Sequence, residues 1–343
     1  MKNKLLLTSA LAGSLLISAS AFAETKITGS IEASYSGTSE NKGTGTNLQS
    51  GDGIGMETQI NFSNSGALNV GGLKYQAGFS VEADGTMDAY EGAHIRIISG
   101  GTSVEIGQDS FQPLDGTVVP RVSLDIASMD PNATNVIKYT GQAGDDVTEQ
   151  MGFGIAQDIG VGKIGFFYSP KDLLASAGGG NDGFVNDATD SGYEVNFKGD
   201  LGVKGLTVLL GKSDRGGGYV ATNTSTQDQE GTMFGAAYNF GKIAIGVSKQ
   251  KQDFTTIGSD IDTQEIGATF AVSDNFSIGA TYAETEVTNA NVKTTADEEI
   301  LLISAGYNLG AITMSVNYQD VENASGVSGT DVEFFNVRLL TKF

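Results

Sequence analysis

The chain has 343 residues, with 41 Asp and Glu against 20 Lys and Arg, a formal net charge of −21 at pH 7. This acidity argues against a nucleic-acid partner, which would require a basic surface, while 17 Phe and 11 Tyr argue against a disordered acidic chain. The chain contains no Cys, which excludes a disulfide framework and thiolate chemistry.

The N-terminus, residues 1–23, has the features of a secretory signal peptide. Lys2 and Lys4 provide a positive start, residues 5–17 form a short apolar run, and an Ala-Phe-Ala cleavage site follows. The apolar run is too short for a transmembrane helix. We therefore expect cleavage to leave residues 24–343 as a single domain, and the loss of two lysines changes its formal charge from −21 to −23.

From residue 25 onward, apolar and polar residues alternate in segment after segment. In 25–35, for example, Ile27, Ile31 and Tyr35 share one face and Lys26 lies on the other. A period of two indicates β-strands with one apolar face. Seventeen candidate strands show this pattern: 25–35, 54–62, 72–83, 91–99, 102–109, 134–141, 149–157, 161–169, 191–199, 204–212, 231–240, 242–251, 262–272, 275–285, 298–308, 311–321 and 331–343.

Three features favour a membrane barrel over a soluble sandwich, the alternative that alternation alone leaves open. Many candidate strands run for ~9–12 residues, the length of a tilted membrane strand. Short turns alternate with long polar loops, as they do in outer-membrane barrels. Aromatic residues also gather in two groups about one strand apart. The group near the short turns is Phe240, Phe270, Phe276 and Tyr307, and the group near the long loops is Tyr35, Tyr168, Tyr282 and Tyr318.

The strand count and the last strand sharpen this prediction. A single-chain bacterial barrel has an even number of strands, so we expect sixteen of the seventeen candidates to be real, and the glycine-rich segment 149–157 is the weakest. The segment 331–343 alternates up to a terminal aromatic residue, Phe343. We interpret Phe343 as the assembly signal of the barrel.

These features together resemble the general diffusion porins of Gram-negative bacteria, in the style of the acidic alphaproteobacterial members. The resemblance spans the mature chain and rests on the signal peptide, the strand pattern, Phe343 and one long loop after the fifth strand. It implies an all-β, transmembrane antiparallel barrel of sixteen strands in the outer membrane, assembled as a homotrimer among lipid and lipopolysaccharide. It also implies that the third loop folds into the pore, and that small hydrophilic solutes and ions cross by passive diffusion.

The long loop at 110–133 is the candidate constriction loop. It contains three of the four prolines, which stiffen a loop and resist strand pairing. It also contains apolar residues that we expect to pack on the inner wall of the barrel: Leu114, Val118, Val119, Val122, Leu124 and Ile126. The alternative is an external loop that covers the mouth or a neighbouring subunit.

The resemblance implies that loop carboxylates face a basic cluster on the wall across the constriction. The loop carboxylates are Asp109, Asp115, Asp125 and Asp130, and the basic candidates are Lys74, His94, Arg96, Lys138 and Arg338. His94 and Arg96 alternate with Ala93, Ile95 and Ile97, so both should face the lumen, whereas Arg121 is ambiguous. Opposed charges across a water-filled neck create a transverse field, and the acid excess predicts mild cation selectivity.

Other chemistry finds little support in the sequence. Two loop clusters are weak Ca²⁺ candidates, Asn181, Asp182, Asp187 and Asp190 in one and Asp145, Asp146 and Glu149 in the other, but neither matches a twelve-residue calcium loop. We otherwise expect no cofactor. A lone His94 and the absence of a GxSxG motif argue against an enzyme. The remaining alternatives are a substrate-specific outer-membrane channel and a structural or adhesive outer-membrane barrel.

Overall fold

The computed structural model describes residues 24–38, 52–82, 91–107, 118–122, 151–170, 191–215, 229–254, 259–289, 292–293 and 296–343. The predicted signal peptide lies outside these residues, and the first strand begins at Glu24. None of the helical structure in the described ranges is both long enough and apolar enough to cross a membrane.

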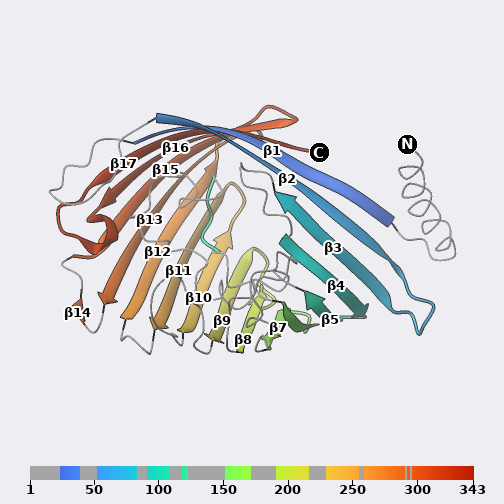
Figure 1. Ribbon diagram of the computed structural model, residues 1–343. Helices are drawn as coiled ribbons and strands as arrows, with labels where there is room; N and C mark the ends of the chain where they lie inside the picture. The colour runs from blue at the N-terminus through green and yellow to red at the C-terminus, as the bar shows by residue number, and fades with distance from the viewer. Residues whose placement is uncertain are drawn as a thin grey trace, which may run out of the picture.

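The described chain forms one antiparallel sheet that closes on itself (Figure 1). Apart from the short strand β14, each strand pairs with its neighbours in sequence, and the last strand pairs with the first. The strands are β1 Glu24–Thr38, β2 Asp52–Ala67, β3 Lys74–Glu82, β4 Glu91–Ser99, β5 Thr102–Gly107, β6 Gly152–Asp158, β7 Gly162–Ser169, β8 Gly192–Gly199, β9 Leu206–Arg215, β10 Gln229–Asn239, β11 Ile243–Phe254, β12 Ser259–Ala271, β13 Phe276–Asn289, β14 Val292–Lys293, β15 Glu298–Asn308, β16 Ile312–Glu322 and β17 Val332–Lys342.

The barrel has sixteen wall strands, which confirms the expected number. β14 is a two-residue strand that pairs only with the tip of β13, and β13 pairs directly with β15. The choice of 149–157 as the weakest candidate was wrong, because β6 occupies most of that segment and pairs with both β5 and β7. Since β5 and β6 are direct neighbours, no wall strand from 134–141, a segment outside the described residues, lies between them.

The wall has its polar side inside and its apolar side outside. On β5, Val104 and Ile106 are 51% and 54% exposed on the outer surface, whereas the side chain of Glu105 between them is buried inside. The same alternation continues on β15, where Leu301 and Ile303 point outward and Ser304 is buried. An apolar outer surface around a closed barrel is stable only in contact with lipid. This arrangement confirms the membrane barrel and excludes the soluble sandwich.

The aromatic residues lie where the sequence predicted. Phe240, Phe270 and Tyr307 are exposed on the outer surface near the short turns. Tyr35, Tyr168, Tyr282 and Tyr318 are exposed nearer to the long-loop ends of their strands. Amphipathic or bulky rings at these two levels match the interfaces of a bilayer.

The barrel closes at a seam between β1 and β17. The backbone N–H of Gly29 donates to the carbonyl of Phe343 at 2.9 Å, and the N–H of Phe343 donates back to the carbonyl of Gly29 at 3.0 Å. The ring of Phe343 lies over Gly29, where an added Cβ atom would be 2.6 Å from Cζ of the ring. Glycine at position 29 therefore makes room for the terminal ring on the outer surface of the seam.

One part of the inner wall is apolar, which simple alternation did not predict. A buried cluster lies at the long-loop ends of the last strands and consists of Ala283, Ile300, Leu302, Val321, Ala324, Val332 and Phe334. Ala324 belongs to the 3-10 helix η2, Ala324–Gly326, in the loop between β16 and β17. This loop contributes to covering these side chains, so they are shielded from the water of the lumen.

Candidate pore constriction

A segment of the third long loop lies on the inner surface of the wall. We call residues 118–122 the strap. Figure 1 shows it as a short teal trace inside the barrel, in front of the strands drawn in yellow and orange. Val118 packs against the buried Leu209 and Met233 of β9 and β10, and Val119 is only 4% exposed. These contacts confirm that the loop folds into the pore, and Val118, Val119 and Val122 pack on the wall as expected.

The strap crosses a row of glycines on the inner wall. This glycine track has one member on each of five neighbouring strands, and the members are Gly235 on β10, Gly246 on β11, Gly267 on β12, Gly279 on β13 and Gly306 on β15. A Cβ atom added at Gly267 would lie 2.5 Å from Cγ1 of Val119, and one at Gly246 would lie 2.8 Å from Cδ of Pro120. Real Cβ atoms do not approach this closely, so the strap rests directly on the backbone of the wall.

Successive strap residues follow the track from one end to the other. An added Cβ atom would lie 2.6 Å from Cγ2 of Val118 at Gly235, and 2.7 Å from Cγ1 of Val122 at Gly306. Val122 also approaches Gly279, where its Cγ2 would lie 3.0 Å from an added Cβ atom, so the strap and its valine side chains together cover all five strands. The track therefore fixes both the direction and the height of the loop along the pore.

An ion pair anchors the strap at its centre. The guanidinium of Arg121 forms a salt bridge with Glu265 on β12, and its Nε donates to Oε1 of that carboxylate at 3.1 Å. The other oxygen, Oε2, accepts a hydrogen bond of 3.1 Å from the hydroxyl of Ser248 on β11. Both charged side chains are at least nine-tenths buried, at 7% and 0% exposure. Removing one partner would leave a buried charge, which typically costs ~3–5 kcal/mol.

Two further arginines form ion pairs within the wall itself. Nε of Arg96 on β4 donates to Oε2 of Glu105 on β5 at 2.5 Å. Arg338 on β17 holds Glu32 on β1 in a bidentate pair across the seam, with Nε donating to Oε1 at 2.6 Å. Three of the chain's four arginines therefore lie on the inner surface, and each is paired there with a glutamate: Glu265, Glu105 or Glu32. A field in this pore cannot come from these arginines alone.

Residues 8–339 match the protein family described as Gram-negative porin. The chain belongs to this family. Its outer-membrane location and its role as a membrane channel follow from the family and from the closed barrel. No curated protein matches the sequence of this porin.

Several solved structures share the fold of the porin at low sequence identity. An anion-selective porin from Comamonas acidovorans has a TM-score of 0.66 at 15% identity, covering 94% of this chain and 100% of that chain. OmpT of Vibrio cholerae, in its trimer form, has a TM-score of 0.65 at 13% identity, covering 94% and 99%. A mutant of the Rh. blastica porin has a TM-score of 0.59 at 14% identity, covering 93% and 100%.

The structure places only some of the predicted constriction residues of the porin. His94 and Arg96 lie on inward-facing positions of β4, and Arg338 lies on an inward-facing position of β17. Lys74 is exposed at the start of β3, next to the short turn at 68–73. Outside the described residues lie Asp109, Asp115, Asp125, Asp130 and Lys138, together with the Ca²⁺ candidates Asn181, Asp182, Asp187, Asp190, Asp145, Asp146 and Glu149. Within the described ranges, no group of three or more His, Asp and Glu residues is placed to hold a metal ion.

The sequence analysis did not predict the glutamates that pair with the arginines of the inner wall. Glu105 alternates with Val104 and Ile106, so its inward position was readable from the sequence. The same holds for Glu265, which precedes the outward-facing Ile266. The pairing of each glutamate with a particular arginine depends on strand register and loop placement, which alternation does not specify.

Proposed function

We propose that this porin is a water-filled, mildly cation-selective channel for passive diffusion of small hydrophilic solutes and ions, and that it acts as a channel rather than as an enzyme. The observation that carries the proposal is the inner wall, whose polar and charged side chains enclose a lumen narrowed by the strap. A pore lined by such groups admits hydrated solutes and makes apolar ones displace ordered water.

The charge balance supports the cation preference. The inner-wall arginines are offset by glutamates, while the whole chain has a net charge of −21. A negative potential around a pore raises the local concentration of cations and lowers that of anions. The Comamonas porin is described as anion-selective, but a likeness at 15% identity shows a shared fold and carries no selectivity over to this chain.

Reconstitution into planar bilayers tests both selectivity and assembly. Under a tenfold salt gradient, the zero-current potential should have the sign of cation flow. The preference should weaken as salt rises, because the Debye length falls from ~10 Å at 0.1 M to ~3 Å at 1 M. We also propose a homotrimer, supported by the trimer form of the Vibrio cholerae structure, so each insertion should show three equal sub-steps. Clear anion selectivity would contradict the first proposal, and single steps the second.

A further inference from the structure

The inner wall of the barrel is open along one side. On the strands from β5 to β17, many inward-facing side chains are buried, and examples are Glu105, Glu194, Gln250 and Asn317. On β1 to β4, by contrast, every inward-facing residue whose exposure is described is at least partly exposed. We call the inward side of these four strands the open face. In the described part of the barrel, water reaches the inner wall mainly along this face.

Uncharged hydrogen-bonding side chains occupy the middle of the open face. We call them the shelf, and its five members are Thr28 and Ser30 on β1, Gln59 and Asn61 on β2, and Ser80 on β3. In the strand register, Ser30 lies opposite Gln59. Asn61 lies between Thr28 on one side and Ser80 on the other. The five side chains therefore form one surface across three strands.

The shelf keeps hydrogen-bonding capacity toward the lumen. Oγ of Ser80 donates to Oδ1 of Asn61 at 2.6 Å, and Nδ2 of Asn61 donates to Oε1 of Gln59 at a long 3.4 Å. Thr28 and Ser30 form no side-chain hydrogen bond with another described residue. Because hydroxyl and amide groups both donate and accept, the shelf presents donors and acceptors together on a partly exposed surface.

The arginines that border the shelf are paired within the wall. On one side, Arg338 of β17 holds Glu32 of β1. On the other side, Arg96 of β4 holds Glu105 of β5. Each guanidinium thus has a carboxylate of its own, and neither supplies a free positive charge to a solute at the shelf.

The remaining inward charges beside the shelf on β1 and β2 are of both signs. Lys26 precedes Thr28 by two positions and pairs with Glu24 at 3.2 Å. Glu57 precedes Gln59 by two positions and is exposed. The shelf itself has no charge, so its hydrogen-bonding groups rather than a net charge distinguish it.

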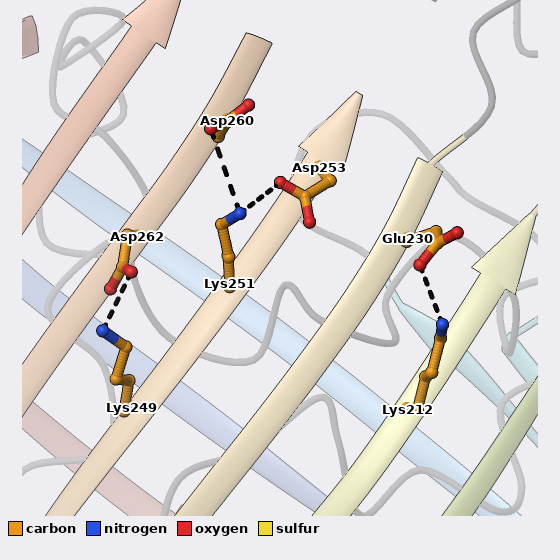
Figure 2. Close-up of polar contacts among 7 residues, drawn as sticks. All are labelled: Lys212, Glu230, Lys249, Lys251, Asp253, Asp260 and Asp262. Atoms are coloured by element: carbon orange, nitrogen blue, oxygen red, sulfur yellow. Dashed lines mark hydrogen bonds and ion pairs between the residues drawn. The ribbon is translucent and has the colours of Figure 1, made fainter. Parts of the chain in front are cut away.

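The wall on the far side of the barrel adds no lysine to the lumen near the strap. Lys212 on β9 and Lys249 and Lys251 on β11 lie at outward-facing positions and are paired there with carboxylates (Figure 2). Lys251, for example, lies 2.7 Å from Asp253 and 3.9 Å from Asp260. These amino groups therefore offset carboxylates on the outer surface.

We propose that the shelf binds neutral polyhydroxylated solutes, such as sugars, during their passage through the porin. The hydroxyl groups of such a solute both donate and accept, so they can exchange their hydrogen bonds with water for hydrogen bonds with the shelf. A charged solute would lose part of its hydration at a surface that has no charge to compensate it. Binding of this kind is weak enough for the solute to leave, as conduction requires. The inference rests on the proposed function as a diffusion channel and names the solute class that its open face favours.

Titration of the single-channel current with sugars tests the inference. In 1 M KCl, charges are screened within ~3 Å. Under these conditions, glucose in both chambers should lower the current by more than it lowers the conductivity of the bulk solution, and this excess block should saturate. Glucosamine and gluconate are charged derivatives of similar size. Each should require at least about twofold more solute for half of the block.

Two double variants with the same change of chemistry separate the open face from the covered wall. Gln59→Met with Asn61→Leu keeps the size of the shelf side chains but removes their amides, and should raise the half-blocking concentration of glucose about fivefold or more. Asn317→Leu with Gln319→Met makes the same change on β16, where the two residues are 0% and 1% exposed. This control should leave the half-blocking concentration within about twofold of the original value.

Each outcome addresses a different claim. An absence of conductance steps would refute the proposed channel itself. An excess block that fails to saturate, or a tighter block by glucosamine or gluconate than by glucose, would overturn the inference alone. Both results need only the unaltered porin, so they decide the inference even if a variant fails to fold. An unchanged half-blocking concentration in the shelf variant, or an equal rise in the two variants, would also overturn it.

Discussion

At the scale of single residues, the glycine track decides where the strap lies. Gly267→Ala would place a methyl group 2.5 Å from Cγ1 of Val119 and 2.9 Å from Oγ1 of Thr281. Overpacking of this kind costs ~1–3 kcal/mol, so the free energy of unfolding in lipid vesicles should fall by about that amount. The single-channel conductance should also fall, because the added methyl group displaces the strap from the wall toward the lumen.

Gly53→Ala is the matched control. This glycine also lies in a wall strand, but an added Cβ atom would meet no other atom within 4 Å, so the free energy of unfolding should change by less than ~0.5 kcal/mol. Equal effects of the two substitutions would show that the track does not hold the strap.

The sequence predicted that the loop is apolar and enters the barrel, but not where each residue would lie. Arg121 illustrates the limit, because nothing next to it in sequence indicates whether it faces water or wall. Its partner Glu265 is 144 positions away. That pairing depends on the track, whose glycines are separate in sequence and become a row only once the strand register is set.

At the scale of elements, the seam between β1 and β17 depends on contacts at the last residue. Phe343→Ala would remove the ring over Gly29 while keeping the backbone pair, at a cost of about 1 kcal/mol because the ring is only partly covered. The fraction of barrel that folds into vesicles should fall, as measured by the heat-dependent shift of folded barrel on gels. Leu309→Ala is the control, since Leu309 is 58% exposed near a short turn and Phe343 is 60% exposed. Equal folded fractions of the two variants would contradict the proposed role of Phe343 in assembly.

Strand positions could be predicted well from the sequence, because each wall strand must show lipid one face and water the other. The errors came from segments in which this constraint is weak. The segment 149–157 seemed doubtful because it is rich in glycine, yet the structure shows a use for Gly152, where an added Cβ atom would lie 2.5 Å from Cζ of the buried Phe167. The inward apolar side chains of β15 and β17 also depart from the rule, because a loop helps to cover them.

At the scale of the whole molecule, apolar and polar residues are separated across the wall, whereas charged residues are unevenly distributed along the barrel axis. Alternation across the wall makes the outside apolar and the inside polar, and it could be predicted from single strands. The gathering of carboxylates at the long-loop ends of the strands, most of them on outward-facing positions such as Glu284 and Glu299, emerges only when turns and long loops are sorted to opposite ends of one barrel. It could have been predicted by adding the charges of alternate connections along the sequence.

The central claim is that one face of each strand borders water inside the barrel and the other borders lipid. Single cysteines on β1 test it most directly, since the chain has none of its own. In lipid vesicles, Ser30→Cys and Ser34→Cys, on inward-facing positions, should react with a charged, water-soluble thiol reagent. Ile31→Cys and Ala33→Cys, on the outer face, should remain unmodified. Equal reaction at all four positions, or reaction at the outer pair alone, would contradict the account.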